Sequence, residues 1–209
     1  GNWTFTAEET FDSLNVGDSV NDIFTVASID GTTSTIEITI NGTNDAAIVS
    51  SATETLAETN AVLTKSGTLT SSDVDNDNSF ITSTSAGAIG SLVIDTAGNW
   101  TFTATEVFDS LNSGDSVNET FTVVSIDGTT SSINITINGT NDAATVRSAT
   151  EILSETGTIL TKSGTLSSSD VDNDNSFTAS TIAGTIGSVV IDSAGNWTFT
   201  AKEAFDRLN

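Results

Sequence analysis

Apolar residues alternate with threonine, serine and other polar residues along most of the chain, and this period of two is the pattern of half-buried β-strands. Ile133, Ile135 and Ile137 alternate with polar residues, and Phe121 and Val123 do so in the run before them. Alternation of this kind places apolar side chains on one face of a sheet and polar side chains on the other. We therefore expect short strands that share an apolar core.

Turn sequences separate these runs. Asp127-Gly128 lies between two alternating runs and is a strong short-range signal for a β-hairpin, and Thr96-Ala97-Gly98 predicts a second hairpin. Trp100 and Phe102 follow that second turn with the same parity. The shared parity favours a core position for the tryptophan, whereas a sugar-stacking platform would require an exposed ring.

One segment departs from the alternation. Within residues 104–111, Val107, Phe108 and Leu111 have helical spacing, which predicts a single helical turn across the end of the sheets. The remaining pattern gives about seven short strands with frequent turns in roughly 100 residues, which is typical of an antiparallel β-sandwich of the immunoglobulin type. The predicted fold class is therefore all-β.

The whole pattern repeats with a period of 97 residues. Trp3, Trp100 and Trp197 each lie in the sequence Gly-Asn-Trp-Thr-Phe-Thr-Ala, and residues 1–44 match residues 98–141 with 8 differences in 44 positions. A period of this length is the size of an independently folding domain and is longer than a solenoid repeat. We expect tandem domains cut from a longer array: residues 1–44 are the C-terminal part of one repeat, 45–141 a complete repeat and 142–209 the N-terminal part of the next.

Composition excludes several functions. The chain has 28 acidic and 5 basic residues, for a formal net charge of −23, so we expect it to bind neither nucleic acid nor anionic membrane surfaces. No apolar run approaches the length of about 18 residues that spans a membrane, so we expect no membrane insertion. Histidine and cysteine are absent, which removes the preferred ligands of zinc, copper and haem and leaves hard ions with oxygen ligands. The same absence removes the usual catalytic bases and thiol nucleophiles, and repeated domains rarely form a catalytic cleft, so we predict that the chain is not an enzyme.

An aspartate-rich loop is the first candidate site. Asp73, Asp75 and Asp77 alternate within Asp73-Val74-Asp75-Asn76-Asp77-Asn78, and the same loop recurs with Asp170, Asp172 and Asp174. Three carboxylates so close together either point into solvent or bind a cation. An EF-hand is excluded because the sixth and twelfth loop positions are Asn78 and Thr84 in place of glycine and glutamate. A calcium-binding loop is the interpretation we favour, and a solvated acidic surface is the alternative.

The junctions between repeats form the second candidate site. Asn44-Asp45 and Asn141-Asp142 lie in the linkers, and glutamates follow them in the first strand region of each repeat. Oxygen ligands from the linker, the strand and the aspartate loop would together satisfy Ca²⁺. Exposed strand charge is the alternative for the glutamates Glu54 and Glu58 and their counterparts Glu151 and Glu155. The predicted junction ligands are Asn44, Asp45, Glu58, Asn141, Asp142 and Glu155.

Lysine is rare enough to raise one further hypothesis. Lys65 and Lys162 occupy equivalent strand positions. A Lys–Asn isopeptide cross-link would need a buried carboxyl group beside the lysine, and the sequence leaves this open.

Seven short segments follow one another in a fixed order in the complete copy, and their order resembles that of a known family. They are Gly67-Thr68-Leu69, Asp73-Val74-Asp75, Ile89-Gly90-Ser91-Leu92, Asp95-Thr96-Ala97-Gly98-Asn99-Trp100-Thr101-Phe102, Phe121-Thr122-Val123, Asp127-Gly128-Thr129 and Ile135-Thr136-Ile137-Asn138-Gly139-Thr140-Asn141-Asp142. This order resembles the VCBS repeat of very large bacterial surface and secreted proteins, which include RTX-type adhesins exported by type I secretion. The resemblance implies a cadherin-like β-sandwich, an extracellular setting and calcium-stiffened tandem arrays in cell adhesion or biofilms. The Asn-Asp linker is also similar to cadherin linkers, which implies that Asp45 and Asp142 bind Ca²⁺.

The predicted function is that of a structural extender in a bacterial extracellular adhesin or surface filament, rigidified by Ca²⁺. Its expected partners are neighbouring identical repeats in the same or adjacent chains, and host or matrix glycans are a further hypothesis. Two alternatives remain: a carbohydrate- or ice-binding module, and a self-assembling extracellular filament subunit. Exposed aromatic or threonine faces would favour the first, and polymers of the isolated chain would favour the second.

Overall fold

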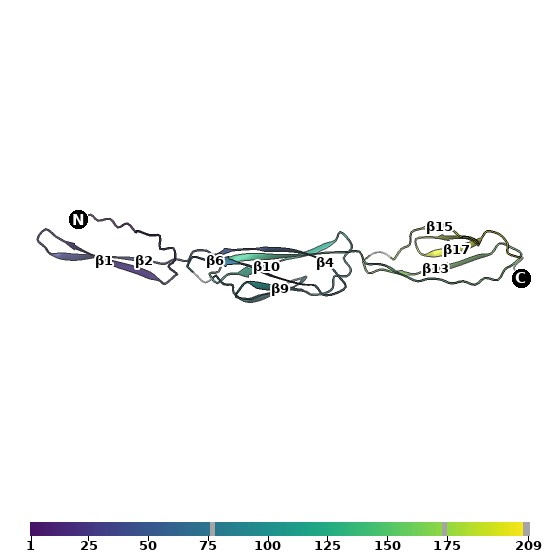
Figure 1. Ribbon diagram of the computed structural model, residues 1–209, viewed down its shortest axis with the longest axis horizontal. Helices are drawn as coiled ribbons and strands as arrows, with labels where there is room; N and C mark the ends of the chain where they lie inside the picture. Colours follow the sequence, from purple (N-terminus) through teal and green to yellow (C-terminus); the bar gives the residue numbers. More distant parts are fainter. Residues whose placement is uncertain (76–77, 173–174, 207–209) are drawn as a thin grey trace. The chain divides into compact units, whose positions relative to one another are not determined.

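The chain forms β-strands joined by turns and loops. A computed structural model describes residues 1–75, 78–172 and 175–206, and these ranges contain no helix, so none that could cross a membrane. The all-β prediction is confirmed (Figure 1). The strands are β1 (Ser19–Ala27), β2 (Thr33–Asn41), β3 (Ile48–Val49), β4 (Ala52–Ala57), β5 (Thr64–Thr68), β6 (Ser71–Ser72), β7 (Ser83–Ala86), β8 (Gly90–Ile94), β9 (Asn99–Ala104), β10 (Ser116–Val124), β11 (Thr130–Asn138), β12 (Thr145–Val146), β13 (Thr161–Thr165), β14 (Ser168–Ser169), β15 (Ser180–Ala183), β16 (Gly187–Ile191) and β17 (Asn196–Ala201).

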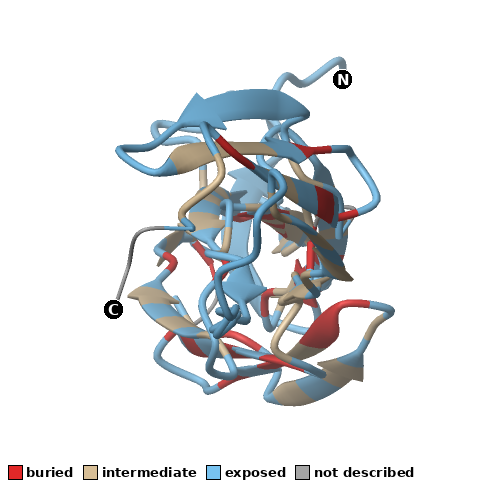
Figure 2. Ribbon diagram, turned by 90° about the vertical axis from the view of Figure 1, so that its right-hand side faces the viewer, coloured by how far each residue is buried: buried red, intermediate tan, exposed pale blue. Residues whose placement is uncertain are grey.

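The strands belong to two units. The first unit comprises Gly1–Leu56, Ala61–Val107 and Val117–Ile137, and the second comprises Ala57–Asn60, Phe108–Ser116 and Asn138–Asn209. Exposed positions dominate the ribbon, and buried positions form short stretches on the strands (Figure 2).

A β-sandwich forms the core of the first unit. One sheet has the strand order β5-β9-β8-β7 and the other β10-β11-β4. The rings of Phe102 and Phe121, one from each sheet, have centroids 5.9 Å apart. Burial of each large apolar side chain contributes about 1.5–3 kcal/mol, so this alternating pattern supplies most of the stability. The buried residues include Leu92, Phe102, Phe121, Val123, Ile133, Ile135 and Ile137, as the alternation predicts.

Strands β4 and β11 are neighbours and run in the same direction. The hydroxyl of Ser131 donates to the carbonyl of Ser50 at 2.8 Å, and the amide of Glu58 donates to the carbonyl of Asn138 at 2.8 Å. Residue numbers therefore increase together along the pair, which makes this pair parallel within a sandwich whose hairpins are antiparallel.

Both predicted hairpin turns are present. Gly98 has φ of 81° and Gly128 has φ of 94°, in the left-handed region that glycine adopts without a steric cost. The carboxylate of Asp127 accepts hydrogen bonds from Ser125, from Thr129 and from the backbone amide of Ala47 at 2.9 Å. This contact ties the hairpin turn to the first residues of the repeat.

The helical turn predicted for residues 104–111 is wrong. This segment contains bends and a turn closed by a hydrogen bond from the Leu111 amide to the Phe108 carbonyl at 3.1 Å. Phe108 has φ of 54° and so cannot continue a right-handed helix. Phe11, its equivalent one period earlier, has φ of 57°, so this conformation is a property of the repeat.

The prediction of a core tryptophan is confirmed in both described copies of the four-stranded sheet. Trp100 is 2 % exposed and lies over Gly67, its cross-strand partner, where an added Cβ would come within 2.5 Å of the ring. Trp197 covers Gly164 in the same way in the sheet β13-β17-β16-β15 of the second unit. The glycine thus makes room for the ring.

Candidate functional site

A glycine in the linker fixes where the acidic residues begin. Gly139 follows β11, and a Cβ there would come within 2.3 Å of the Asn112 carbonyl oxygen and 2.4 Å of the Leu111 carbonyl oxygen. Its amide donates to the Asp115 carbonyl at 2.9 Å. Gly42 has the same close contacts with Leu14 and Asn15. The linker therefore packs directly against the loop that carries Asp109.

Three carboxylates converge next to this linker, within the second unit. Glu58, Asp109 and Asp142 each offer an oxygen atom, and the three atoms lie within 4.8 Å of one another. Glu58 is 3 % exposed, and its Oε1 accepts hydrogen bonds from the amide and the hydroxyl of Thr140 at 3.0 and 2.6 Å. The linker thus holds the glutamate in place.

The conformation of Phe108 positions Asp109. A bulky residue with positive φ costs on the order of 1–3 kcal/mol, and such conformations cluster at functional sites. Reversing the chain at Phe108 turns the next side chain towards Glu58 and Asp142. The Oδ1 atom of Asp109 is buried and has no hydrogen-bond partner among the residues that the structure describes.

The aspartate loop supports the third carboxylate. The backbone amide of Asp142 donates to Oδ2 of Asp172 at 3.1 Å, and the amide of Asp172 donates to Oδ1 of Asp170 at 3.3 Å. Asp172 is 7 % exposed. Burial raises the pKa of Asp142, and so do the negative charges of four neighbours: Asp109, Glu58, Asp172 and Asp170. Four carboxylates therefore act on Asp142 at this place.

The earlier linker repeats part of this arrangement within the first unit. The amide of Asp45 donates to Oδ2 of Asp75 at 3.1 Å, and the amide of Asp75 donates to Oδ1 of Asp73 at 3.1 Å. The side chain of Asp73 raises the pKa of Asp75, and burial raises it further. The loop geometry is therefore a property of the repeated sequence.

The structure brings together four of the predicted ligands and adds one that the sequence analysis missed. Glu58, Asp142, Asp170 and Asp172 meet at one linker, whereas Asp109 was not predicted. Its signal was available, because aspartate follows phenylalanine at this point in every copy, as Asp12, Asp109 and Asp206.

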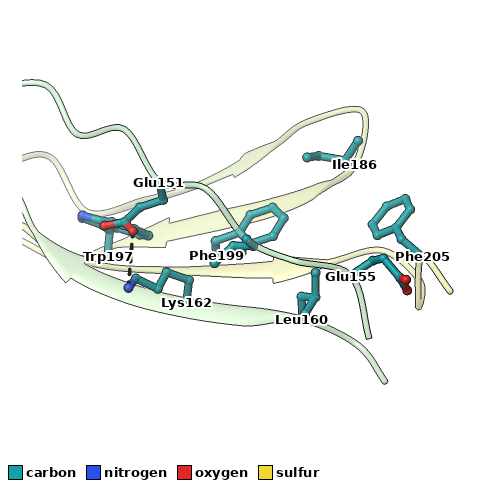
Figure 3. A pocket seen from close by; sticks show the side chains of 9 residues that line it. Glu151, Glu155, Leu160, Lys162, Ile186, Trp197, Phe199 and Phe205 are labelled. Carbon is teal, nitrogen blue, oxygen red and sulfur yellow. Dashed lines mark ion pairs between the residues drawn. The ribbon is translucent and has the colours of Figure 1, made fainter. Parts of the chain in front are cut away.

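Other predicted ligands lie elsewhere. The side-chain amides of Asn44 and Asn141 donate to the carbonyls of Asp45 and Asp142, at 2.7 and 2.5 Å. Glu155 lines a groove of the second unit together with Leu160 and Phe199 (Figure 3) and joins no group of three acidic residues within the described ranges. Asp77 and Asp174 lie outside the described residues.

The lysines form ion pairs with the other predicted glutamates. Lys65 Nζ lies 3.0 Å from Oε2 of Glu54, and Lys162 Nζ lies 3.3 Å from Oε2 of Glu151. Glu54 is on β4 and Lys65 is on β5, so the first pair joins the edges of the two sheets of the sandwich.

The donor set at Glu58, Asp109 and Asp142 fits a hard divalent cation. All its charged groups are carboxylates, which are the ligands that Ca²⁺ prefers. A buried carboxylate oxygen without a hydrogen-bond donor is costly unless a cation compensates it, and Asp109 Oδ1 is such an atom among the described residues. Burial and the neighbouring negative charges raise the pKa of Asp142, and Ca²⁺ bound there would compensate both.

No family model matches the chain, and no curated protein sequence does, so the resemblance to the VCBS repeat stays a prediction. Among solved structures the chain is similar to PcdhgB3 EC1-4, a structure of cadherin repeats, with 12% identity and a TM-score of 0.47 over 90% of this chain and 56% of that one. It is also similar to a structure from a 1.5-MDa bacterial ice-binding adhesin, with 17% identity and a TM-score of 0.30 over 88% of this chain and 63% of that one. The chain spans less than two thirds of each of these structures.

Proposed function

We propose that the chain is a spacer segment of an extracellular bacterial adhesin or surface filament, in which Ca²⁺ stiffens the junction between consecutive repeats. The convergence of Glu58, Asp109 and Asp142 within 4.8 Å supports this proposal most directly. The repeated architecture and the excess of acidic residues add to it. Trp100 and Trp197 are buried, which favours a structural module over an exposed aromatic binding platform, whereas Trp3 is 59 % exposed.

The positions of the ligands along the sequence explain the stiffening. Glu58 and Asp109 belong to the copy at residues 45–141, whereas Asp142 and the loop residues Asp170 and Asp172 belong to the next copy. An ion held by both groups cross-links two consecutive copies at their linker. The linker then has fewer accessible conformations, which is what a spacer requires.

Calcium would also stabilise the folded chain, because the carboxylates converge only after folding. Extracellular calcium modules typically have Kd values of about 10⁻⁴–10⁻³ M, which suits the millimolar calcium outside cells. At about 100 times Kd the stabilisation is about 2.7 kcal/mol. Intracellular calcium concentrations would leave such a site empty, so the proposed site is consistent with an extracellular setting.

Isothermal titration calorimetry of the whole chain tests the proposal. We expect millimolar Ca²⁺ to bind the wild type, and Asp142→Asn to weaken this binding at least tenfold. Glu203→Gln is the matched control, because it removes one exposed negative charge from the second unit outside the cluster. Equal calcium affinities for the wild type and Asp142→Asn would refute this assignment of the site.

Limited proteolysis tests the stiffening separately. Ca²⁺ should slow cleavage within residues 138–145 of the wild type and leave the cleavage rate of Asp142→Asn almost unchanged. Binding without protection of the linker would retain the calcium site and remove its role as a stiffener.

A further inference from the structure

The linkers contain the two Asn-Gly dipeptides of the chain, Asn41-Gly42 and Asn138-Gly139. An Asn-Gly dipeptide is prone to deamidation because glycine has no Cβ to shield the peptide nitrogen that attacks the asparagine side chain. The glycine nitrogen bonds to Cγ of the asparagine, ammonia leaves and a succinimide ring forms. Water then opens the ring to aspartate or to isoaspartate, in which the main chain runs through the former side chain. The reaction requires no enzyme and no reactant besides water.

Packing requires the glycine of this dipeptide. A Cβ on Gly139 would come within 2.3 Å of the Asn112 carbonyl oxygen, and a Cβ on Gly42 within 2.2 Å of the Asn15 carbonyl oxygen. Asn138, in contrast, is exposed, and its side-chain amide forms no hydrogen bond with the residues that the structure describes. The reactive side chain is therefore open to water, and protection against deamidation must come from the backbone.

The backbone of the folded linker supplies this protection. Cyclisation requires the peptide group between Asn138 and Gly139 to rotate towards the side chain, and hydrogen bonds hold this group at both ends. The Glu58 amide donates to the Asn138 carbonyl at 2.8 Å, and the Gly139 amide donates to the Asp115 carbonyl at 2.9 Å. The second bond also engages the proton that the nitrogen loses when it attacks. Asn138 is the last residue of β11, and the extended backbone of a strand keeps Cγ away from that nitrogen.

The residues that hold this peptide group also hold the carboxylate cluster. Oε1 of Glu58 accepts hydrogen bonds from the amide and the hydroxyl of Thr140, the residue after Gly139. One glutamate therefore fixes the chain on both sides of the reactive peptide group. Rotation of that group requires the linker to separate from Glu58.

We propose that Asn138-Gly139 is a deamidation site that the folded linker suppresses, and that its products prevent an opened linker from closing again. Isoaspartate lengthens the main chain by a methylene group immediately before Gly139, which displaces Thr140 from Glu58. Aspartate adds a negative charge close to Thr140, the residue that holds the Glu58 carboxylate, and like charges repel. Each reaction is irreversible, so the modified fraction of the protein increases with the time that the linker spends open.

An effect of calcium on this reaction rests on the proposed function, whereas suppression by the folded linker does not. An ion bound to Glu58, Asp109 and Asp142 would keep the linker closed, so Ca²⁺ should slow deamidation at Asn138. Equal deamidation rates in calcium and in EDTA would count against the proposed calcium site and would leave suppression by the folded linker in place.

Peptide mapping by mass spectrometry of the whole chain, incubated at mildly alkaline pH, tests the proposal. We expect deamidation at Asn138 to be at least tenfold slower in native buffer than in urea. Glu58→Ala and the milder Thr140→Val should each raise the rate at Asn138 several-fold in native buffer. The rate at Asn41 should stay unchanged in both variants, because Asn41 belongs to the first unit and Glu58 to the second.

Glu155→Ala is the matched control for Glu58→Ala. Glu155 is the equivalent glutamate one period later, and it is exposed and forms no hydrogen bond within the described residues. This substitution should change neither deamidation rate.

Limited proteolysis tests the effect of the products on the linker. Wild type that has been deamidated in urea and refolded should be cleaved within residues 139–145 faster than untreated wild type. Asn138→Gln treated in the same way is the control, because glutamine cyclises far more slowly and only Asn41-Gly42 then remains as an Asn-Gly dipeptide. Its linker should be cleaved at the rate of the untreated protein.

Three results would overturn the proposal. The first is an equal rate of deamidation at Asn138 in native buffer and in urea. The second is an unchanged ratio of deamidation at Asn138 to that at Asn41 in both Glu58→Ala and Thr140→Val. The third is cleavage of the treated wild type at the same rate as the treated Asn138→Gln variant. The ratio in the second result separates opening of this linker from general unfolding, which would accelerate deamidation at both sites.

Discussion

Replacing Asp109 by asparagine should have opposite effects on stability in the absence and in the presence of calcium. Without calcium, the substitution removes one of several mutually repelling carboxylates, so the second unit should become more stable. With calcium, the same substitution removes a ligand, so the variant should become less stable than the wild type. Asparagine keeps the shape of the side chain, so packing is almost unchanged.

The expected change in the free energy of unfolding follows from the distances between the carboxylate oxygens of the cluster. Two like charges 4.8 Å apart repel by about 3.5 kcal/mol at an effective dielectric near 20, and partial exposure reduces this towards about 1 kcal/mol. The variant should therefore gain about 1 kcal/mol in EDTA. A tenfold weaker Kd removes about 1.3 kcal/mol of calcium stabilisation when calcium is about 100 times the original Kd. For a unit of 60–100 residues each kcal/mol shifts the melting temperature by roughly 4–8 °C.

Thermal unfolding followed by circular dichroism, in EDTA and in a calcium series, measures both effects with dilute protein. The melting temperatures of the wild type and Asp109→Asn should cross as the calcium concentration rises.

The increase in melting temperature that calcium causes should also be smaller near pH 4 than at pH 7. The pKa of Asp142 is raised in the folded protein by burial and by its acidic neighbours. In EDTA, protonated Asp142 therefore contributes stability below its ordinary pKa of about 3.8, and this contribution is lost as the pH rises through the pKa of the folded protein. Protons therefore compete with calcium.

A variant that is less stable than the wild type in EDTA would refute this reasoning, because the carboxylate would then stabilise the fold by itself. Parallel calcium responses of the two proteins would equally show that Asp109 is not a ligand.

Two further predictions concern the fold. Burial raises the pKa of Asp127, but hydrogen bonds from Ser125, Thr129 and Ala47 outweigh burial, so the pKa is lowered overall. The Asp127 carboxylate therefore contributes stability above about pH 4, and this contribution is lost as the pH falls. The melting temperature of Asp127→Asn should therefore fall less steeply with decreasing pH below pH 4 than that of Asp30→Asn. Equal pH dependences of the two melting temperatures would contradict this prediction. Gly67→Ala should cost about 1–3 kcal/mol in urea unfolding because its Cβ would clash with the indole, whereas Gly157→Ala, which has open space, should cost little.

The sequence was sufficient for the fold because the alternation and the turn residues are local signals. The inward positions of Ile133, Ile135 and Ile137 follow from parity, and the turn at Gly128 follows from the need for positive φ. The helical turn at residues 104–111 was wrong because spacing alone does not reveal that Phe108 adopts a left-handed conformation.

The candidate site was predictable only in part because its members are distant in sequence. Asp142 and Glu58 were predicted from the acidic linker and strand. Asp109 resembles an ordinary turn residue, and only the packing of its loop against Gly139 brings it to the linker. Alternation shows which face a residue occupies, but it does not show which ends of the sandwich meet.

The parallel pairing of β4 and β11 has a mechanical consequence. β4 is near the start of the copy at residues 45–141, and β11 is the last strand before the next linker. Tension applied along an array pulls β4 and β11 in opposite directions along their length. Because the strands are parallel, this pull slides one strand along the other and loads their hydrogen bonds together, whereas a peeling force would break them one after another. The copy at residues 45–141 is thus arranged to resist extension under load.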